Sequence, residues 1–392
     1  MKITGVEIFD IQCEAPTWHP VIVRLQTDEG ISGLGEAGLA YGTGHSAAVG
    51  MVRNLAEGFV IGADPFKSEK LWENMFRSSF WGTAGGPVVY GGMSAIDIAL
   101  WDTKGKALGV PVYQLLGGKT NDNLRTYASQ IQFDWDRVER RNLVKPEEYA
   151  EAARKAVADG YDAVKLDPLI VDREGQAVHM GRLGLLTHDR VVEYRNRVKA
   201  VRDAVGPDVD VILDLHSLLS PATAQQLADV WADLNCFFYE EPVNYLQPEL
   251  QNVVTRNVRV PMAAGERIYT RWGYRKYFEQ NSLAVIQPDL GLVGGLSEGK
   301  KICDLAHIYD VTVQCHVCGS PVATAAALQL EAAIPNFLIH EHHTNALKQY
   351  NIELCRQDYQ PVHGRFTIPD LPGLGIELND EVVKRSPCVR VP

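Results

Sequence analysis

The chain has no long apolar run, although 46% of its 392 residues are hydrophobic. A helix that crosses a bilayer needs about 20 consecutive apolar residues, and polar residues interrupt every hydrophobic stretch before that length. The first residues, MKITGVEIFDIQCE, also lack the basic leader and the cleavage site of a secretory signal. These absences predict a soluble cytoplasmic protein with no membrane partner.

Positive charge is also in short supply, with a formal net charge of −11 and a pI near 5.5. A protein of this sign repels nucleic acids and anionic membranes. It is still compatible with a small anionic substrate, because a bound divalent cation reverses the local field. We therefore expect a small-molecule partner and no nucleic-acid partner.

Cysteine is scarce, and its seven positions are scattered from Cys13 to Cys388. An odd, scattered set is typical of reduced thiols rather than of a disulfide framework. Cys315 and Cys318 have the spacing of half a zinc site, but no second CxxC or HxxxH pair accompanies them. We expect no structural zinc, and we expect a chain of this length to form two domains.

The N-terminal stretch, from Met1 to about Val60, begins with the alternating polarity of an antiparallel meander, and helical patterns follow. Val21, Val23 and Leu25 fall on one face of it. Strands followed by helices predict an α+β domain. Two loops, 14–20 and 37–44, interrupt it and are either plain connectors or a lid over a site. Trp18 and His19 on the first loop are candidate substrate contacts.

From Thr126 onward, short apolar runs alternate with helical patterns. Eight parallel strands joined by helical crossovers close into a barrel, and ligands bind at the carboxyl ends of its strands. The pattern predicts a capping domain at 1–125, a barrel at 126–355 and a C-terminal segment, 356–392, that returns to the capping domain. The predicted barrel strands are 126–132, 162–168, 209–216, 236–243, 260–266, 283–290, 311–317 and 336–343.

Three acidic residues, Asp214, Glu240 and Glu266, end three consecutive predicted strands at equal spacing (240 − 214 = 266 − 240). Equal intervals indicate a repeated strand and helix unit that delivers three carboxylates to one rim. Three adjacent anions stay ionised when a cation joins them, and oxygen ligands favour a hard ion such as Mg²⁺. The sequence therefore predicts a Mg²⁺ site.

Other charged residues also fall at the ends of the predicted strands, whereas side chains inside a barrel are usually apolar. They indicate a ligand site and comprise Lys165, His216, Asp289, His316 and Glu341. Arg267 either contacts substrate or packs structurally. Of the three histidines around Glu341, which are His340, His342 and His343, we expect at least one on the surface.

Together these motifs resemble the enolase superfamily and, within it, the mandelate racemase subgroup. The resemblance rests on the glutamates in EEP and GER, on QPD at 287–289, on His316 in the strand after it, and on DIALWDTKGKALGVPVYQLLGG at 97–118. It implies a (β/α)7β barrel with an N-terminal α+β capping domain that the C-terminal segment completes. It also implies Asp214, Glu240 and Glu266 as Mg²⁺ ligands, and a symmetric homo-oligomer.

The Asp214-Leu-His216 pair narrows the resemblance to the sugar-acid dehydratases, galactonate dehydratase in particular. Glu341, at the end of the strand after His316, matches by its spacing a glutamate of that group. The substrate implied is an aldonic or aldaric acid.

The residues themselves support removal of a proton alpha to a carboxylate. Mg²⁺ would stabilise the enediolate, and Lys165 would add a second positive charge. His316, with its tautomer fixed by Asp289, would be the base, and His216 would protonate the departing beta hydroxyl. The product would be a 2-keto-3-deoxy acid. The two histidines could exchange roles for a substrate of opposite configuration.

Other functions remain open at this point. A racemase, epimerase or cycloisomerase would use the same enolisation, and a metabolite-binding relative could keep the metal site without catalysis. Many members of the subgroup carry Lys-x-Lys on the second strand, whereas this chain has Lys165-Leu-Asp167, which disfavours a two-base racemase. Asp167 either binds a substrate hydroxyl or caps the next segment.

Overall fold

The computed structural model describes residues 1–13, 17–138, 140–178 and 184–392. Part of the first predicted loop, residues 14–16, therefore lies outside the described residues. In the described part of the chain, no helix is long and apolar enough to cross a membrane. The cysteines, from Cys13 to Cys388, are all free thiols.

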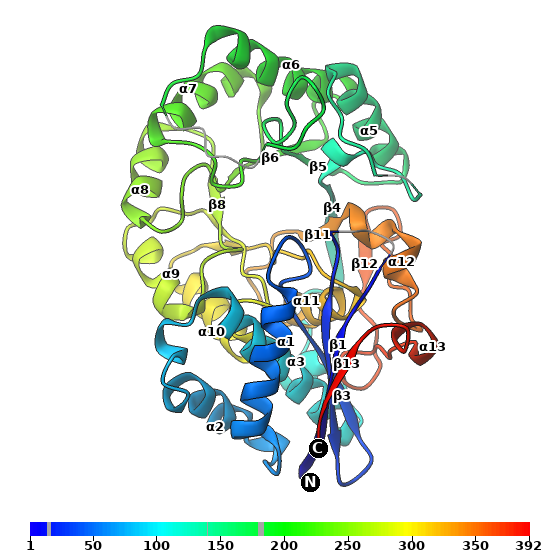
Figure 1. Ribbon diagram of the computed structural model, residues 1–392. Coiled ribbons are helices and arrows are strands. Elements are labelled where there is room, and N and C mark those ends of the chain that lie inside the picture. The colour runs from blue at the N-terminus through cyan, green and yellow to red at the C-terminus, as the bar shows by residue number, and fades with distance from the viewer. Residues whose placement is uncertain (14–16, 139, 179–183) are drawn as a thin grey trace.

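The N-terminal sheet is antiparallel, with its strands in the order β13-β1-β2-β3. The C-terminal strand lies beside the N-terminal one, so the two chain ends meet at one end of the molecule (Figure 1). Val21, Val23 and Leu25 are buried on one face, as predicted, but Ile22 is buried as well. The strand is therefore not half-exposed there, because Ile22 packs into the core cluster that includes the barrel. The strands are β1 (Ile3–Asp10), β2 (Val21–Thr27), β3 (Ser32–Ala37) and β13 (Cys388–Val391).

Helix α3 (Gly86–Leu108) lies against this sheet and is buried over most of its length. Its close approach to β3 depends on Gly35, because a Cβ atom there would lie 1.9 Å from the carbonyl oxygen of Ala95. The remaining α-helices before the barrel are α1 (His45–Leu55), α2 (Ser68–Glu73) and α4 (Val112–Leu115). Strands followed by helices form the predicted α+β capping domain.

The strands of the barrel are parallel and follow the order β10-β9-β8-β7-β6-β5-β4-β11. A parallel bridge between Val313 and Phe337 closes the remaining gap between β10 and the start of β11. Each predicted strand range overlaps one of them. They are β4 (Asn123–Ser129), β5 (Ala163–Leu166), β6 (Asp210–Asp214), β7 (Tyr239–Glu240), β8 (Met262–Ala264), β9 (Val285–Ile286), β10 (Thr312–Val313) and β11 (His340–His343).

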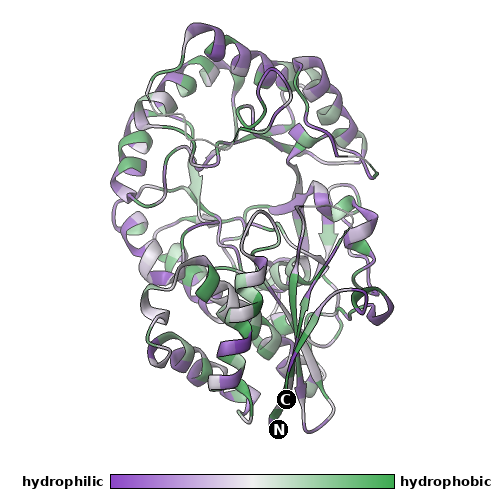
Figure 2. Ribbon diagram, viewed as in Figure 1, coloured by the Kyte–Doolittle hydropathy of each residue, from purple (hydrophilic) through white to green (hydrophobic). Residues whose placement is uncertain are grey.

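Helices α5 to α11 surround the barrel, with hydrophilic residues on the outer faces of α6 and α7 (Figure 2). Ser220 and Ser320 cap two of them by accepting backbone N–H groups of the first turn. This arrangement confirms the predicted fold class. The helices are α5 (Pro146–Ala158), α6 (His188–Val205), α7 (Pro221–Trp231), α8 (Pro248–Asn257), α9 (Thr270–Glu279), α10 (Gly295–Ile308) and α11 (Pro321–Ala333).

After the barrel, the chain runs through α12 (Gln349–Ile352), β12 (Arg365–Thr367) and α13 (Asp380–Val383) to β13. Strand β12 pairs antiparallel with the start of β4 at the base of the barrel. The last strand then joins the capping sheet. The boundaries at 125 and 355 stay a prediction.

Two buried carboxylates of the capping domain hold the N-termini of barrel helices. Glu36, near the end of β3, accepts hydrogen bonds from the backbone N–H groups of Ser320 (2.9 Å) and Ala323 (3.2 Å) at the start of α11. Asp97, on α3, accepts from the backbone N–H of Ser297 (2.8 Å) in the first turn of α10. Helix N-termini favour negative charge, so these contacts fix the capping domain over the end of the barrel.

Candidate active site

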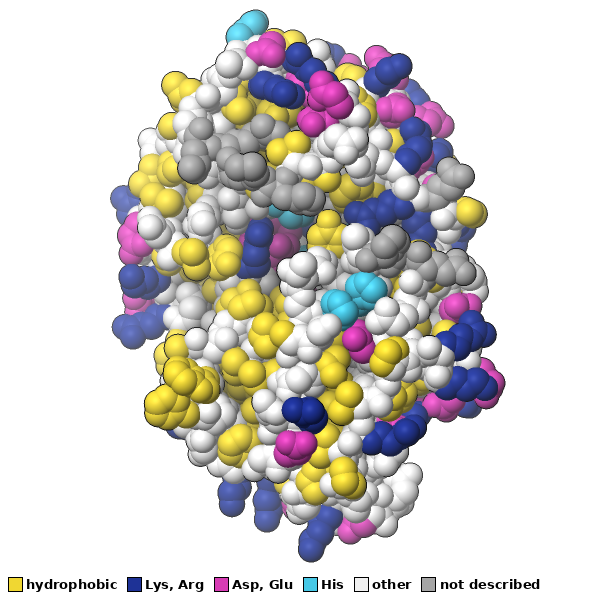
Figure 3. All heavy atoms as spheres, viewed as in Figure 1, with side chains coloured by type: hydrophobic (Ala, Val, Ile, Leu, Met, Phe, Trp, Pro, Cys, Tyr) yellow, Lys and Arg dark blue, Asp and Glu magenta, His cyan; other side chains and the backbone are white. Residues whose placement is uncertain are grey.

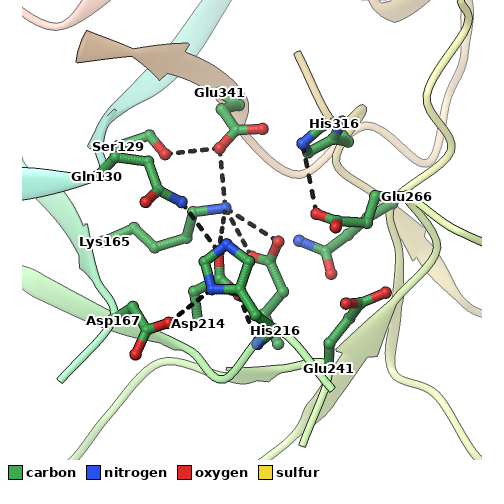
Figure 4. Close-up of polar contacts among 12 residues, drawn as sticks. Ser129, Gln130, Lys165, Asp167, Asp214, His216, Glu241, Glu266, His316 and Glu341 are labelled. Atoms are coloured by element: carbon green, nitrogen blue, oxygen red, sulfur yellow. Dashed lines mark hydrogen bonds and ion pairs between the residues drawn. The ribbon is translucent and has the colours of Figure 1, made fainter. Parts of the chain in front are cut away.

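Buried carboxylates surround Lys165 at the carboxyl ends of the strands (Figure 4). The Lys165 Nζ lies 2.8 Å from an oxygen of Glu240, 2.8 Å from one of Glu341 and 3.4 Å from one of Asp214. Asp214 and Glu240 are direct partners in the β6–β7 register. The strand ends therefore bring Asp214 and Glu240 together, as their spacing predicts, and add Lys165 and Glu341 to them.

Glu266 lies apart from that cluster, on the cavity side. One of its oxygens is 3.3 Å from His316 Nε2, and the other is 3.3 Å from Arg267 Nε. Arg267 also binds Glu241, which is buried. The third predicted metal ligand is thus held by two cationic side chains rather than by Lys165.

His316 and Asp289 form a hydrogen-bonded pair across the ends of β9 and β10. His316 Nδ1 lies 2.7 Å from Asp289 Oδ2, and the other Asp289 oxygen accepts the backbone N–H of Gly291 at 2.7 Å. Because the Asp289 carboxylate can only accept a hydrogen bond, His316 Nδ1 is the protonated donor. Nε2 is then the ring nitrogen that can take a proton from a substrate. Burial works against the charged imidazole, yet Glu266 and Asp289 outweigh it and raise the pKa of His316 to about 10.

His216 and Asp167 form a second pair of the same kind across the ends of β5 and β6. His216 Nδ1 lies 2.6 Å from Asp167 Oδ2. The other Asp167 oxygen accepts the backbone N–H groups of Leu169 (2.7 Å) and Ile170 (3.1 Å). Burial again opposes the charged imidazole, but Asp214 and Asp167 raise the pKa of His216 to about 10. Asp167 therefore caps the following segment and also orients a histidine.

Both histidines face one cavity of about 450 Å³ between the barrel and the capping domain. Figure 3 shows the molecule from the side of this cavity, as a hollow with acidic, basic and histidine side chains inside it. Glu266 and Arg267 line the cavity from the barrel, and Tyr41 lines it from the loop after β3. A volume of this size accommodates a small organic acid.

Four of the twelve predicted site residues, His216, Glu266, Arg267 and His316, line this cavity, and the other eight do not. Trp18 is 1% exposed and stacks on His343, with ring centroids 6.4 Å apart. His19 stacks on His45 at 4.4 Å, and Lys165 is fully buried behind the carboxylates. Substrate contact by Trp18 and His19 stays a prediction that the cavity lining does not favour.

The expectation that one of the histidines around Glu341 is on the surface is wrong. His340, His342 and His343 are all at least nine-tenths buried. His340 binds Glu331 and His342 binds Tyr161 in the layer outside the barrel, while His343 lines the cavity. Helices and the C-terminal segment cover the outer face of β11, which its short sequence could not indicate.

Several polar residues of the site were missed by the sequence reasoning. Gln130 donates a hydrogen bond to Asp214 (3.1 Å), and Ser129 donates one to Glu341 (2.6 Å). Ser129 ends the first barrel strand and Gln130 follows it, so their position at a strand end is the same signal that marks the charged residues of the site. Arg140, which also lines the cavity, had no comparable signal. His343 lines it as well and was named with the histidines around Glu341, but the sequence did not show which of them faces the cavity.

The carboxylate set fits a hard cation by its chemistry. Among the described residues, no group of three Asp, Glu, His or Cys side chains is arranged to hold a metal ion. Lys165 lies against Glu240, and His316 lies against Glu266. The donors are nevertheless all oxygens, which suits Mg²⁺. Burial and then the charge of Asp214 raise the pKa of Glu240 to about 8. Because burial is the largest cause, the shift shows mainly that this carboxylate is costly to ionise without further positive charge beside it.

Comparison with known proteins gives the family. Residues 148–382 match the family model described as enolase C-terminal domain-like, and residues 15–117 match the N-terminal domain of mandelate racemase / muconate lactonizing enzyme. The chain belongs to the enolase superfamily. The resemblance to its mandelate racemase subgroup is thereby confirmed.

The relatives include dehydratases of sugar acids. D-galactonate dehydratase from Variovorax paradoxus is 33% identical, with 97% of this chain and 93% of that protein covered. D-xylonate dehydratase from Haloferax volcanii is 34% identical, with 98% and 88% covered. A member of the enolase superfamily from Salmonella Typhimurium is 49% identical over the whole of both chains, with a TM-score of 0.97. The predicted enzyme class, a hydro-lyase of the enolase superfamily, agrees with these relatives.

Proposed function

We propose that the protein is a Mg²⁺-dependent dehydratase that converts an aldonic or aldaric acid into a 2-keto-3-deoxy acid. The observation that carries the proposal is the pair of histidine and aspartate dyads that face one cavity beside a cluster of carboxylates. The names of the relatives support a sugar acid as substrate. Elimination of water needs both a base and an acid, and the two dyads supply them.

The metal ligands would be Asp214, Glu240 and Glu266. A bound Mg²⁺ would supply positive charge where the substrate carboxylate becomes an enediolate. Lys165 adds a fixed positive charge behind this site through its ion pairs with Glu240 and Glu341. Glu341 also accepts the backbone N–H of Val317 at 2.9 Å, directly after the dyad histidine, and so positions it.

In the first step, His316 Nε2 takes the proton from the alpha carbon. The electron pair of the broken C–H bond moves into the carboxylate group and gives the enediolate. In the second step, the beta C–O bond breaks while His216 gives its proton to the departing hydroxyl, and water leaves. The enol that remains then converts to the 2-keto-3-deoxy acid. A substrate of opposite configuration would exchange the roles of the two histidines.

The raised pKa values of the histidines fit this proposal. In the protein alone, the surrounding carboxylates favour both imidazolium forms at neutral pH. A general base must be neutral, so His316 can act only when those carboxylates are compensated by other positive charge. A divalent cation at the site would provide that compensation.

The racemase alternative has less support. Asp167 stands where a second-strand lysine base would be needed, and its oxygens already bind His216 and two backbone N–H groups. Arg267 lines the cavity and is proposed to bind substrate. A homo-oligomeric state and a cytoplasmic location stay predictions.

The test is a screen of aldonic and aldaric acids with Mg²⁺ for 2-keto-3-deoxy product. We expect turnover of at least one acid and its loss after treatment with EDTA, with recovery on addition of Mg²⁺. Full activity in EDTA would contradict the metal, and the absence of any product across the panel would support the non-catalytic alternative. Solvent deuterium at the alpha carbon without loss of water would favour a racemase or epimerase.

A further inference from the structure

One arginine of the cavity wall has no acidic partner among the described residues. The guanidinium carbon of Arg140 lies 4.0 Å from the ring centroid of Phe133 and 5.9 Å from that of Tyr41. Aromatic faces attract a cation but do not neutralise it. Within the described ranges of the chain, Arg140 has no ion pair with a carboxylate. Its N–H donors are therefore available to a ligand in the cavity.

Two nearby arginines differ from Arg140 in this respect. Arg267, which also lines the cavity, binds Glu241 and Glu266. The next residue in the chain, Arg141, binds Asp134 at 2.9 Å and Glu148 at 2.8 Å. Both are occupied by carboxylates of the protein. Arg140 alone of these three carries a charge that the described part of the protein leaves unbalanced.

His343 supplies a second donor close to Arg140. Its Nδ1 accepts the backbone N–H of Asn345 at 3.1 Å, so the neutral ring carries its proton on Nε2. Burial, helped by the positive charge of Arg140, lowers the pKa of His343 to about 3 and keeps the ring neutral. Trp18 lies nearly parallel to the ring, at an interplanar angle of 15°, and limits its rotation. His343 thus presents a fixed N–H group at the cavity wall.

The cavity wall around these two groups offers donors and apolar surface rather than negative charge. Phe133, Ile170 and Tyr41 line it beside Arg140, and Glu266 is the one carboxylate among the described lining residues. A guanidinium binds a carboxylate with two parallel hydrogen bonds, which gives both energy and geometry. A neutral hydroxymethyl group would leave that charge unsatisfied.

We propose that Arg140, together with His343, binds the second carboxylate of a sugar diacid. This inference rests on the proposed function and narrows the substrate from sugar acids in general to aldaric acids. The first carboxylate of the substrate lies at the site of Asp214, Glu240 and Glu266. The second carboxylate lies against Arg140 at the wall formed with Phe133.

The experiment uses pairs of acids that differ only at the far carbon, D-galactonate with galactarate and D-xylonate with xylarate. We expect the wild-type protein to have a higher kcat/KM for one of the diacids than for its monoacid partner. Arg140→Leu keeps the packing on Phe133 and removes the charge. It should lower kcat/KM for the diacid by about 10²-fold, mainly through KM, because a charge-assisted bidentate contact is lost. The value for the monoacid should change less than about threefold.

Arg141→Leu is the matched control, because it removes the same charge from the same segment outside the cavity wall. It should leave the ratio of diacid to monoacid unchanged, and thermal unfolding should show that both variants fold. Equal loss for diacid and monoacid in Arg140→Leu, or a wild-type preference for the monoacid, would overturn the inference while the dehydratase stands. The absence of product from every acid would overturn the proposed function itself.

Discussion

The two histidine and aspartate dyads use the same contact on different backbones. In each, an aspartate at the end of one strand accepts from the histidine that ends the next strand, at 2.6 Å for Asp167 and His216 and at 2.7 Å for Asp289 and His316. In each, the other aspartate oxygen accepts backbone N–H groups of its own loop. The cavity therefore has an oriented imidazole from each of two separate strand pairs.

The backbone at the two histidines is different. His216 has a φ of 45°, in the left-handed region that non-glycine residues rarely adopt. His316 forms a parallel bridge with Asp289. His316 also has Glu266 at 3.3 Å from its Nε2, whereas the nearby carboxylate of Asp214 lies 3.4 Å from the Nδ1 of His216. Only the imidazole of His316 therefore has its reactive nitrogen beside a predicted metal ligand among the described residues.

The largest expected effect separates the two dyads by reaction step. His316→Asn should remove both dehydration and exchange of the alpha hydrogen, with losses of about 10²–10⁴-fold for general base catalysis. His216→Asn should lose dehydration but keep solvent deuterium exchange at the alpha carbon, measured by NMR. The reverse pattern would mean that the roles are exchanged. Mg²⁺ binding should stay nearly intact in both, and near-wild-type turnover in both would refute the mechanism.

Replacing one of the predicted metal ligands should reduce the reaction steps of both dyads together. Glu240→Gln removes one charge from the predicted ligand set and should weaken Mg²⁺ binding, measured by calorimetry. Hydrogen exchange and dehydration should then fall in parallel and recover in part with excess Mg²⁺. Glu241→Gln is the control, because that adjacent carboxylate binds Arg267 instead, and it should bind Mg²⁺ like the wild type. Equal Mg²⁺ affinity in Glu240→Gln would contradict the ligand assignment.

Replacing each aspartate tests whether the dyads are equivalent. Asp289→Asn and Asp167→Asn should each lower kcat by about 10²-fold or more, because the imidazole loses its fixed tautomer. Asp167 accepts two backbone N–H groups and Asp289 accepts one. The melting temperature should therefore fall further in Asp167→Asn. A wild-type kcat in either variant would show that its aspartate does not orient the histidine for catalysis.

A smaller effect concerns a carboxylate outside both dyads. Burial raises the pKa of Glu36 from 4.5 to about 7, although hydrogen bonds from Ser320 and Ala323 oppose the shift. The folded protein then keeps a proton that the unfolded chain loses, so this stabilisation is complete below pH 4.5 and is lost as the pH rises to about 7. The melting temperature of the wild type should fall relative to Glu36→Gln across that window. If the melting temperatures of the wild type and Glu36→Gln changed in parallel with pH, the raised pKa of Glu36 would be contradicted.

The fold and much of the site were predictable because parallel strands put their ends at one rim. The regular spacing of Asp214, Glu240 and Glu266 needed only the length of the repeating unit. The pairing of Asp289 with His316 was also expected, since it joins adjacent strand ends at the same kind of interval. These features depend on strand order, which hydrophobic periodicity gives.

Other features of the site could not be predicted, because they depend on local backbone conformation or on contacts between segments that are far apart in the sequence. The contact of His216 with Asp167 requires a left-handed turn after β6, and no sequence pattern indicates that turn for a histidine. The burial of Trp18 against His343 joins the capping loop to the last barrel strand. The charge of Arg140 is unbalanced because none of the described carboxylates lies within ion-pair distance of it, and this depends on the tertiary structure. None of these follows from spacing along the sequence.

The two carboxylates that hold α10 and α11 also fix the position of one wall of the cavity. If the capping domain tilted away, Glu36 and Asp97 would lose their donors while two helix N-termini lost their acceptors, and each unpaired buried group is costly. Gly38, at the start of the loop after β3, is tied to Gly291 by a further backbone hydrogen bond of 2.8 Å. The capping domain therefore serves as a fixed wall.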